Sequence, residues 1–314
     1  MPRSVPMQMP MPAAKREGIR ALLAPLLVLL GSFTLYCLTA ARAPGWVDAT
    51  LILHLVRVPE IGIWANTHSL FNLLGHLWLG VFARADPHFA LTMLCALLGS
   101  LTVTFMFLAA EQATGSRKAS ALACAALAVS LSLWWHSTTI EVYTLNTALI
   151  ALILYLVLRA YRRKAPGALY LAFFFGGLGV FNHVLMGLYA LAFFGVLLPH
   201  GARSFRLGLG RSLALVLCYL AGAAPYAALF VGAWRANFVH LATGGNAGAA
   251  GGLAVALRSL GETFRYATGG RFLASMFPRG LAAGQGLFWR LNYPFLVLLN
   301  YPSAAIVFIV TGFP

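Results

Sequence analysis

Long runs of apolar residues with almost no charge constrain this chain more than any other feature. Of its 314 residues, 61% are hydrophobic and only 9% are charged, and the mean hydropathy is +0.82. Soluble domains carry about a quarter charged residues, so this chain has too few to cover a surface that faces water. The composition therefore predicts an integral membrane protein.

The apolar runs have the length of membrane-spanning helices, since about 20 residues cross a bilayer as a helix. None of them shows the alternating polar pattern of a barrel strand. We therefore predict an all-α integral membrane protein with about eight transmembrane helices. The expected spans are 20–41, 87–111, 118–135, 140–160, 167–183, 185–199, 211–234 and 291–313. They form a single polytopic domain, 20–314, after a polar tail, 1–19, whose composition predicts disorder.

Basic and acidic residues separate onto opposite sides of these spans. Lys and Arg residues fall at every second connection, which marks that side as cytoplasmic, whereas five of the seven acidic residues and seven of the eight histidines fall on the other side. This pattern predicts a cytoplasmic N-terminus with most acidic residues facing outward, and we expect a bacterial-type inner (cell) membrane protein. Much of the net charge of +15 is this cytoplasmic excess. It favours contact with membrane lipids and gives no support to nucleic-acid binding.

The first outer loop, 42–86, is too long to be a turn. Its first half is predicted to be a short amphipathic helix that ends at Pro59. The polar and the apolar face of this helix consist, respectively, of Thr50, His54 and Arg57, and of Leu51, Leu55 and Val58. In the second half, His68, Asn72 and His76 recur every four residues among apolar neighbours. We therefore expect two interfacial helices in this loop.

The second outer loop, 235–290, combines a glycine-rich stretch, "TGGNAGAAGG", with several arginines. The glycines are interpreted as a hinge or a close-packing element, because no strand–helix context supports a phosphate-binding loop. The outer cations of this loop are Arg258, Arg265, Arg271 and Arg279.

Local helix signals offer structural explanations for three acidic residues. Asp86 followed by Pro87 is typical of a helix start. Asp48 is a good cap for the helix that runs toward Val58. Glu141 stands three residues after Thr138, the spacing of a capping box at the start of the fourth span. For Asp48 and Glu141, the alternative is that both side chains face an outer cavity.

Three segments carry a resemblance to a known family. "TTIEVYTLNTALIALILYLVLRAYRR", "YLAFFFGGLGVFNHVLMGLYALAF" and "RYATGGRFLASMF" resemble successive motifs of membrane glycosyltransferases of the GT-C superfamily. The group that they resemble most is the protein O-mannosyltransferase-like family (domain of unknown function 2723). The matching positions are Asp48, Glu141-Val142-Tyr143 and Asn182-His183. Where the family has a His-Pro-Pro-Gly-Tyr-Pro segment, this chain has "NTHSLFNLLGHL", which keeps His68 without the prolines.

The resemblance implies transfer of a sugar from a polyprenyl-phosphate donor to a hydroxyl of a protein, glycan or lipid acceptor on the outer face. Asp48 is then expected to be the general base, a role that contributes roughly 10²–10⁴-fold in rate. Glu141 is the second catalytic candidate, at an acceptor or metal site, and a divalent cation (Mg²⁺ or Mn²⁺) is left open. The expected substrate-binding residues are His54, Arg57, His68, Tyr143, Asn182, His183 and Arg271, the last for the departing phosphate.

Simpler explanations remain open for two of these residues. His183 stands where a side chain can satisfy the last carbonyls of a helix. Arg271 can be an arginine that extends to the membrane interface.

Two other classes of protein compete with a glycosyltransferase. A transporter or lipid flippase would carry ionisable residues deep within its spans and related halves, and no predicted span has a central Asp, Glu, Lys or Arg. A non-catalytic assembly subunit would show no clustering of acidic residues on one side. The outward acids therefore favour the glycosyltransferase.

Overall fold

The computed structural model describes residues 13–43, 47–59, 61–63, 67–184, 186–187, 189, 194–195, 208–243 and 252–267. Several predicted features lie outside these residues. They are most of the tail 1–19, most of the span 185–199, the span 291–313, and the segment 268–290 of the second outer loop, which includes Arg271.

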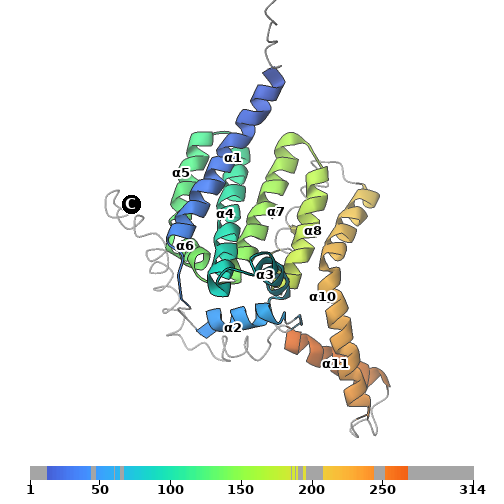
Figure 1. The fold of residues 1–314 in the computed structure, drawn as a ribbon. Helices are drawn as coiled ribbons and strands as arrows, with labels where there is room; N and C mark the ends of the chain where they lie inside the picture. Colours follow the sequence, from blue (N-terminus) through green and yellow to red (C-terminus); the bar gives the residue numbers. More distant parts are fainter. Residues whose placement is uncertain are drawn as a thin grey trace, which may run out of the picture.

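The described part of the chain is helical and contains no strand. Helices stand side by side as a bundle, and other helices gather at one end of it (Figure 1). The bundle consists of α1 (Ala13–Leu38), α4 (Pro87–Thr114), α5 (Arg117–Ala128), α7 (Tyr143–Arg163), α8 (Gly167–Asn182) and α10 (Leu209–Thr243). The helices at its end are α2 (Val47–Arg57), α3 (Ser69–Val81), α6 (Leu131–Thr138) and α11 (Gly252–Ala267).

Membrane-length helices are present, as the hydropathy predicts. In the described residues, α4, α7 and α10 are long and apolar enough to cross a bilayer, and α5 with α6 makes a fourth if the bent pair counts as one span. They correspond to the predicted spans 87–111, 140–160, 211–234 and 118–135. The apolar part of α1, Leu22–Leu38, and α8 are shorter. The all-helical membrane character is confirmed, and the number of eight spans stays a prediction.

The predicted span 118–135 is broken, because α5 and α6 meet at an angle of 63°. Ser130 lies at the break, and its hydroxyl donates to the Leu127 carbonyl at 2.7 Å. The hydroxyl of the fully buried Tyr36 donates to the Ala128 carbonyl at 2.9 Å. Side chains thus satisfy carbonyls that a continuous helix would have satisfied itself. Hydropathy reports the length of an apolar run and not its direction, so the break was not predicted.

Helix α4 lies at the centre and contributes to two packed clusters. On one side, Cys95 and Leu91 belong to a cluster with apolar residues of α2, α3, α7, α8 and α10. On the other side, Val103 and Phe107 pack with residues of α1, α5 and α6, including Tyr36. Asp86 caps this central helix as predicted, because its carboxylate accepts the Phe89 N–H at 2.8 Å.

Helices α8 and α10 approach each other closely through two glycines. A Cβ at Gly177 would occupy the space of the Tyr219 carbonyl and lie 2.8 Å from the Ala223 nitrogen. A Cβ at Gly222 would collide in the same way with the Phe174 carbonyl. Small residues that bring two backbones together are typical of helix pairs in membranes. The contact also fixes how α10 stands against α8.

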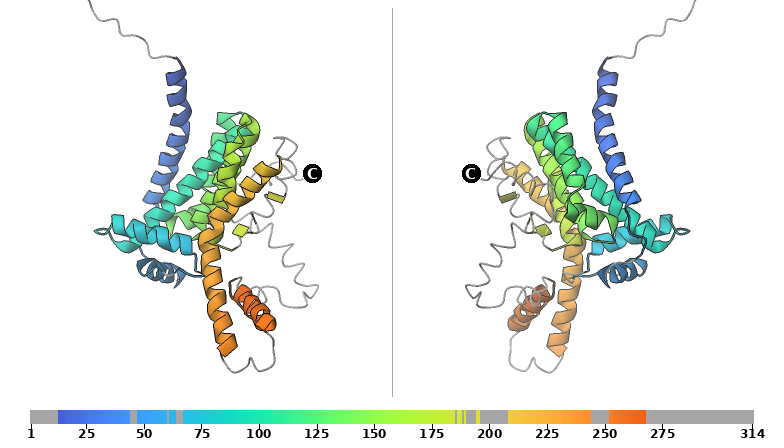
Figure 2. Two further views of the ribbon diagram at one scale, coloured as in Figure 1. Left: turned by 90° about the vertical axis from the view of Figure 1, so that its right-hand side faces the viewer. Right: turned by 90° about the vertical axis from the view of Figure 1, so that its left-hand side faces the viewer.

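The bundle has one basic end. Arg162, at the end of α7, donates to the Ala113 carbonyl near the end of α4 at 2.6 Å. Arg117, at the start of α5, pairs with Glu111 of α4 at 2.6 Å. These contacts hold arginines of two helices, α5 and α7, against the end of α4. The short helices α2, α3 and α6 lie at the opposite end of the bundle (Figures 1 and 2).

Candidate functional site

Four of the predicted substrate-binding residues meet at the end opposite the arginines. His68 directly precedes α3, Tyr143 begins α7, Asn182 ends α8, and His183 follows it. The rings of His68 and His183 are 5.1 Å apart between centroids. Tyr143 lies 6.3 Å from His68 and 6.5 Å from His183. We call these four residues the His68 cluster.

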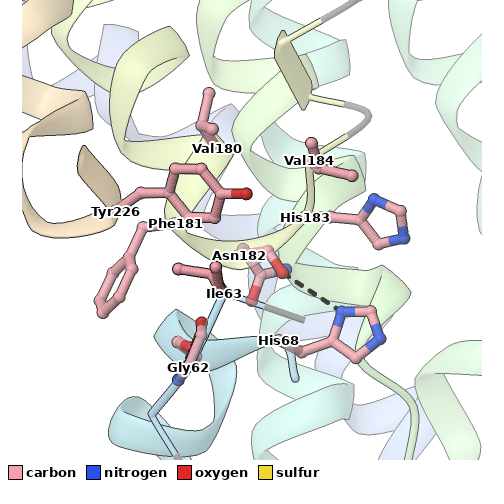
Figure 3. Close-up of a pocket in the computed structure, with 10 residues that line it drawn as sticks. Gly62, Ile63, His68, Val180, Phe181, Asn182, His183, Val184 and Tyr226 are labelled. Atoms are coloured by element: carbon pink, nitrogen blue, oxygen red, sulfur yellow. Dashed lines mark hydrogen bonds between the residues drawn. The ribbon is translucent and has the colours of Figure 1, made fainter. Parts of the chain in front are cut away.

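Asn182 holds the His68 cluster together. It is only 2% exposed, and its side-chain oxygen accepts the Phe71 N–H of α3 at 2.9 Å. Its amide group donates to Asn146 of α7 at 2.8 Å, and its backbone carbonyl lies 3.2 Å from Nδ1 of His68 (Figure 3). One buried side chain therefore connects α3, α7 and α8.

Replacing Asn182 with alanine is expected to destabilise the protein more than replacing Asn146 does. Asn182→Ala leaves the buried Phe71 N–H without its partner, and an unsatisfied buried donor costs about 1–3 kcal/mol. Asn146→Ala removes a single bond and keeps the contact with α3. Thermal unfolding of both variants and of the double variant in detergent measures the difference. A smaller effect for Asn182→Ala than for Asn146→Ala would contradict the connecting role.

His68 adopts a left-handed backbone conformation, with φ 44° and ψ 49°. This region is uncommon for residues other than glycine, although His, Asn and Asp enter it more readily than others. The contact with the Asn182 carbonyl holds the ring against α8. Burial, together with the neighbouring His183, lowers the pKa of His68 to about 4. Burial also lowers the pKa of His183. At neutral pH the pair therefore offers hydrogen bonds and no positive charge.

The low pKa of His68 predicts a loss of stability in acid. The folded state resists protonation, whereas the unfolded state takes up a proton near pH 6.5, so stability is complete above pH 6.5 and falls as the pH approaches 4. The loss is on the order of 3 kcal/mol. His68→Asn, which tolerates the left-handed conformation, should flatten this dependence. Melting temperatures of both proteins between pH 7.5 and 4.5 check it; parallel pH profiles would contradict it.

A small pocket opens beside the His68 cluster. Its enclosed space is about 10 Å³, about enough for one water molecule. The lining residues are Gly62, Ile63, His68, Ser69, Val180, Phe181, Asn182, His183, Val184 and Tyr226 (Figure 3). Pockets for whole ligands of drug size measure about 300–1,000 Å³. This one is therefore too small for a sugar ring in this structure, and it marks the point where the lining side chains converge.

The pocket wall is fixed by the segment before α3. The Ser69 hydroxyl donates to the Gly62 carbonyl at 2.9 Å and accepts the Gly62 N–H at 3.0 Å. Tyr226, which comes from α10, closes the other side. The sequence did not single out Gly62, Ser69 or Tyr226. No local pattern marks them, because they line the pocket only after α3 and α10 have packed against α8.

Glu141 lies in the connection between α6 and α7. It lies beside His136, which in turn lies beside Tyr143 of the His68 cluster. Its carboxylate is 4.0 Å from Nδ1 of His136, and the His136 ring lies edge-on to Tyr143 at 5.4 Å. Nδ1 of His136 is buried and has no hydrogen-bond partner among the described residues. His136 was not predicted as a site residue. Its signal was the polar run "HSTTIE" inside an apolar stretch.

The capping-box explanation for Glu141 is wrong. Helix α7 begins at Tyr143 and its cap is Val142. Thr138 instead ends α6, and its hydroxyl donates back to the Trp134 carbonyl at 2.9 Å. The break between α6 and α7 leaves Glu141 in the connection, where its N–H lies 3.4 Å from Sγ of Cys95.

Two other predicted residues of the first outer loop, His54 and Arg57, do not join the His68 cluster. His54 and Arg57 are exposed on α2. Asp48 is the second residue of α2, which begins at Val47, so the helix does not start after it as a simple cap would require. The Asp48 side chain lies outside the described residues.

Helix α2 packs through a different apolar face from the predicted one. Ala49, Ile52 and Val56 are buried, whereas Leu51 and Val58 are 53% and 68% exposed. The sequence contains enough apolar residues for two faces, and only packing against α3 and α4 decides which one turns inward. Pro59 follows the end of α2 as predicted.

Two polar residues of α3, Asn72 and His76, contact backbone carbonyls of the protein. Asn72 is 1% exposed and donates to the Thr67 carbonyl at 2.6 Å. Nδ1 of His76 lies 3.1 Å from the Val56 carbonyl at the end of α2. The spacing of four residues was correct for a helix, but the partners of these side chains are protein carbonyls.

No group of three His, Cys, Asp or Glu side chains that could hold a metal ion forms within the described residues. The His68 cluster contains two imidazoles, those of His68 and His183. Glu141 lies beside a different histidine, His136. Since the carboxylate of Asp48 is not described, the divalent cation stays an expectation.

Comparison with known proteins gives a family match over part of this chain. Residues 67–203 match the family described as Protein O-mannosyl-transferase TMEM260 N-terminal domain. A curated relative, Protein O-mannosyl-transferase TMEM260 of Mus musculus, is 27% identical over 207 residues, or 63% of this chain and 29% of the relative. The chain therefore spans less than a third of that relative's length. No solved structure matches it. The resemblance to the protein O-mannosyltransferase-like family is thus confirmed, and the family match covers the region that builds the His68 cluster.

Proposed function

We propose that this chain is a GT-C-type membrane glycosyltransferase that moves a sugar from a polyprenyl-phosphate donor to an acceptor hydroxyl. The observation that supports this function best is the convergence of His68, Asn182 and His183 around one pocket, with Tyr143 beside the two histidine rings, inside the region that matches the family. The relative's name suggests mannose as the sugar and a protein as the acceptor. A glycan or lipid acceptor would use the same chemistry.

In this proposal, Asp48 is the general base. It takes the proton of the acceptor hydroxyl while the hydroxyl oxygen bonds to the anomeric carbon. The bond from that carbon to the phosphate oxygen breaks, and polyprenyl phosphate leaves with the electron pair. Glu141 serves the acceptor, directly or through a divalent cation. A negatively charged leaving group is stabilised best by a fixed cation, and Arg271 is proposed for this role.

The remaining residues bind the donor. The His68 cluster supplies neutral hydrogen-bonding groups to the sugar. His54 and Arg57 are exposed on α2 and are proposed to contact the donor phosphate or lipid headgroups. The exposed Leu51 and Val58 of the same helix fit a helix in the membrane interface.

The proposed orientation follows the charge distribution. The basic end of the bundle is cytoplasmic and the pocket faces outward, as the positive-inside rule requires. A bacterial inner membrane remains part of the proposal, while the curated relative comes from mouse. A transporter is less well supported, because the buried polar residues in the described part of the chain are Ser, Thr, Asn and His.

A donor assay on the purified full chain in lipid nanodiscs tests the function. Radiolabelled polyprenyl-phosphate mannose and, separately, the glucose donor are supplied with a Ser/Thr-rich peptide. We expect label on the peptide, or slow release of free sugar, with one donor and none in empty nanodiscs. Absence of both binding and release for either donor would refute the proposal and favour a transport or assembly role.

A further inference from the structure

Helix α11 is attached to α10 through polar contacts. Nε1 of Trp234 donates to the Ser259 hydroxyl at 2.9 Å. The amide group of Asn237 donates to the Ser259 carbonyl at 3.1 Å and lies 3.4 Å from the Thr263 hydroxyl. The buried residues of α11 are Val255, Ser259, Thr263 and Ala267. The face turned toward α10 is therefore made of small and polar side chains.

The apolar side chains of α11 lie on a different face. Leu253, Leu257 and Leu260 are 74%, 61% and 38% exposed. Their spacing of four and three residues makes a continuous stripe along the helix. At 3.6 residues per turn, the centre of this stripe is about 100° from the centre of the packed face. This helix therefore carries two faces of opposite character, with the apolar one turned outward.

A third face of α11 is charged. Arg258 pairs with Glu262 at 3.0 Å, and Arg265 is exposed on the same side. Two arginines against one glutamate leave this face with a net positive charge. A helix with an apolar stripe beside a cationic face has the pattern of helices that lie along a membrane surface.

The attachment point lies near the expected membrane boundary. Helix α10 has 35 residues, and about 20 suffice to cross the hydrocarbon core. Counted from the residues after Arg211, the span ends close to Trp234, the residue type that is enriched at the interface. Helix α11 crosses the far part of α10 and lies on the same side of the bundle as α2 (Figures 1 and 2).

We propose that α11 lies in the outer lipid interface and binds the membrane surface. Leu253, Leu257 and Leu260 enter the boundary between headgroups and acyl chains, and Arg258 and Arg265 face the lipid phosphates. An exposed apolar stripe is unfavourable in water, and the lipid at this depth covers it. The binding partner is the bilayer itself, and the contact does not depend on any sugar transfer.

A fluorophore attached to an unnatural amino acid at position 257 tests this placement in the full chain, and it leaves the four native cysteines untouched. The matched control position is Tyr266, which is 58% exposed and, nine residues further along, lies about 180° around the helix from Leu257. Each labelled chain is placed in nanodiscs of phosphatidylcholine and phosphatidylglycerol. Quenching is measured with nitroxide-labelled lipids and with aqueous iodide.

We expect the label at 257 to be quenched at least twofold more by nitroxide lipid than the label at 266, and to be protected from iodide. Equal access of iodide to both positions would overturn the proposal. Protection of position 257 from both quenchers would also overturn it, because another protein surface, from a second copy or from this chain, would then cover the stripe. Labelled chains must elute like the unlabelled protein. The donor assay is independent, so failure of either proposal leaves the other standing.

Discussion

Asp48→Asn is expected to lower the rate of sugar transfer by roughly 10²–10⁴-fold, the usual contribution of a general base. Asparagine keeps the size of the side chain and removes its ability to take a proton. A base acts only in the transition state, so kcat should fall while KM stays nearly constant. Initial rates with the preferred donor, at several acceptor concentrations, separate the two parameters.

Asp86→Asn is the matched control for this substitution. It also removes a carboxylate from the same side of the protein, but Asp86 caps α4, and asparagine is an equally good cap. Its activity should therefore remain close to that of the unmodified protein. If Asp48→Asn retained full activity while Glu141→Gln abolished it, the base would be Glu141 and the assignment of Asp48 would be wrong.

Gly222→Leu is expected to prevent α8 and α10 from packing. Even the first carbon of a side chain at this position would collide with the Phe174 carbonyl, which belongs to the backbone and cannot turn away. Inserting extra methylenes into a well-packed core typically costs about 1–3 kcal/mol of stability. The cost here should be larger, because the two helices have to separate. We expect loss of the monodisperse peak in fluorescence-detected size-exclusion chromatography. Tyr226 stands one helical turn further along α10, so the pocket should be lost as well.

Gly232→Leu provides the control on the same helix. A Cβ at Gly232 meets no atom within 4 Å, and leucine is a better helix former than glycine by about 1 kcal/mol. This variant should therefore elute and melt like the unmodified protein or slightly better. Equal behaviour of the two leucine variants would show that the close approach at Gly222 does not hold the bundle together.

Features encoded within a few neighbouring residues could be predicted from the sequence. The start of α4 at Asp86-Pro87 follows from the chemistry of helix caps, and the end of α2 follows from Pro59. The long apolar helices follow from composition. In contrast, the bend after Ala128 depends on a hydrogen bond from Tyr36, which lies 92 residues away in the chain. Such a partner leaves no local signal.

The residues of the candidate site could be predicted from the sequence, but their arrangement in space could not. The family resemblance selected His68, Tyr143, Asn182 and His183 as residues in chain order, and their convergence appeared only in the folded protein. His136 was missed because a single histidine in an apolar stretch does not reveal what lies beside it. The inward face of α2 could not be chosen either, since both of its faces contain apolar residues.

The hydrogen bond between His68 and Asn182 joins residues 114 positions apart, which has a consequence for biosynthesis. Ribosomes add roughly 5–20 residues per second, so His68 emerges roughly 6–23 s before its partner. During that interval α3 has no α8 to dock on. The pocket therefore assembles only after most of the bundle has entered the membrane, and the candidate site stays incomplete in a nascent chain until insertion is nearly finished.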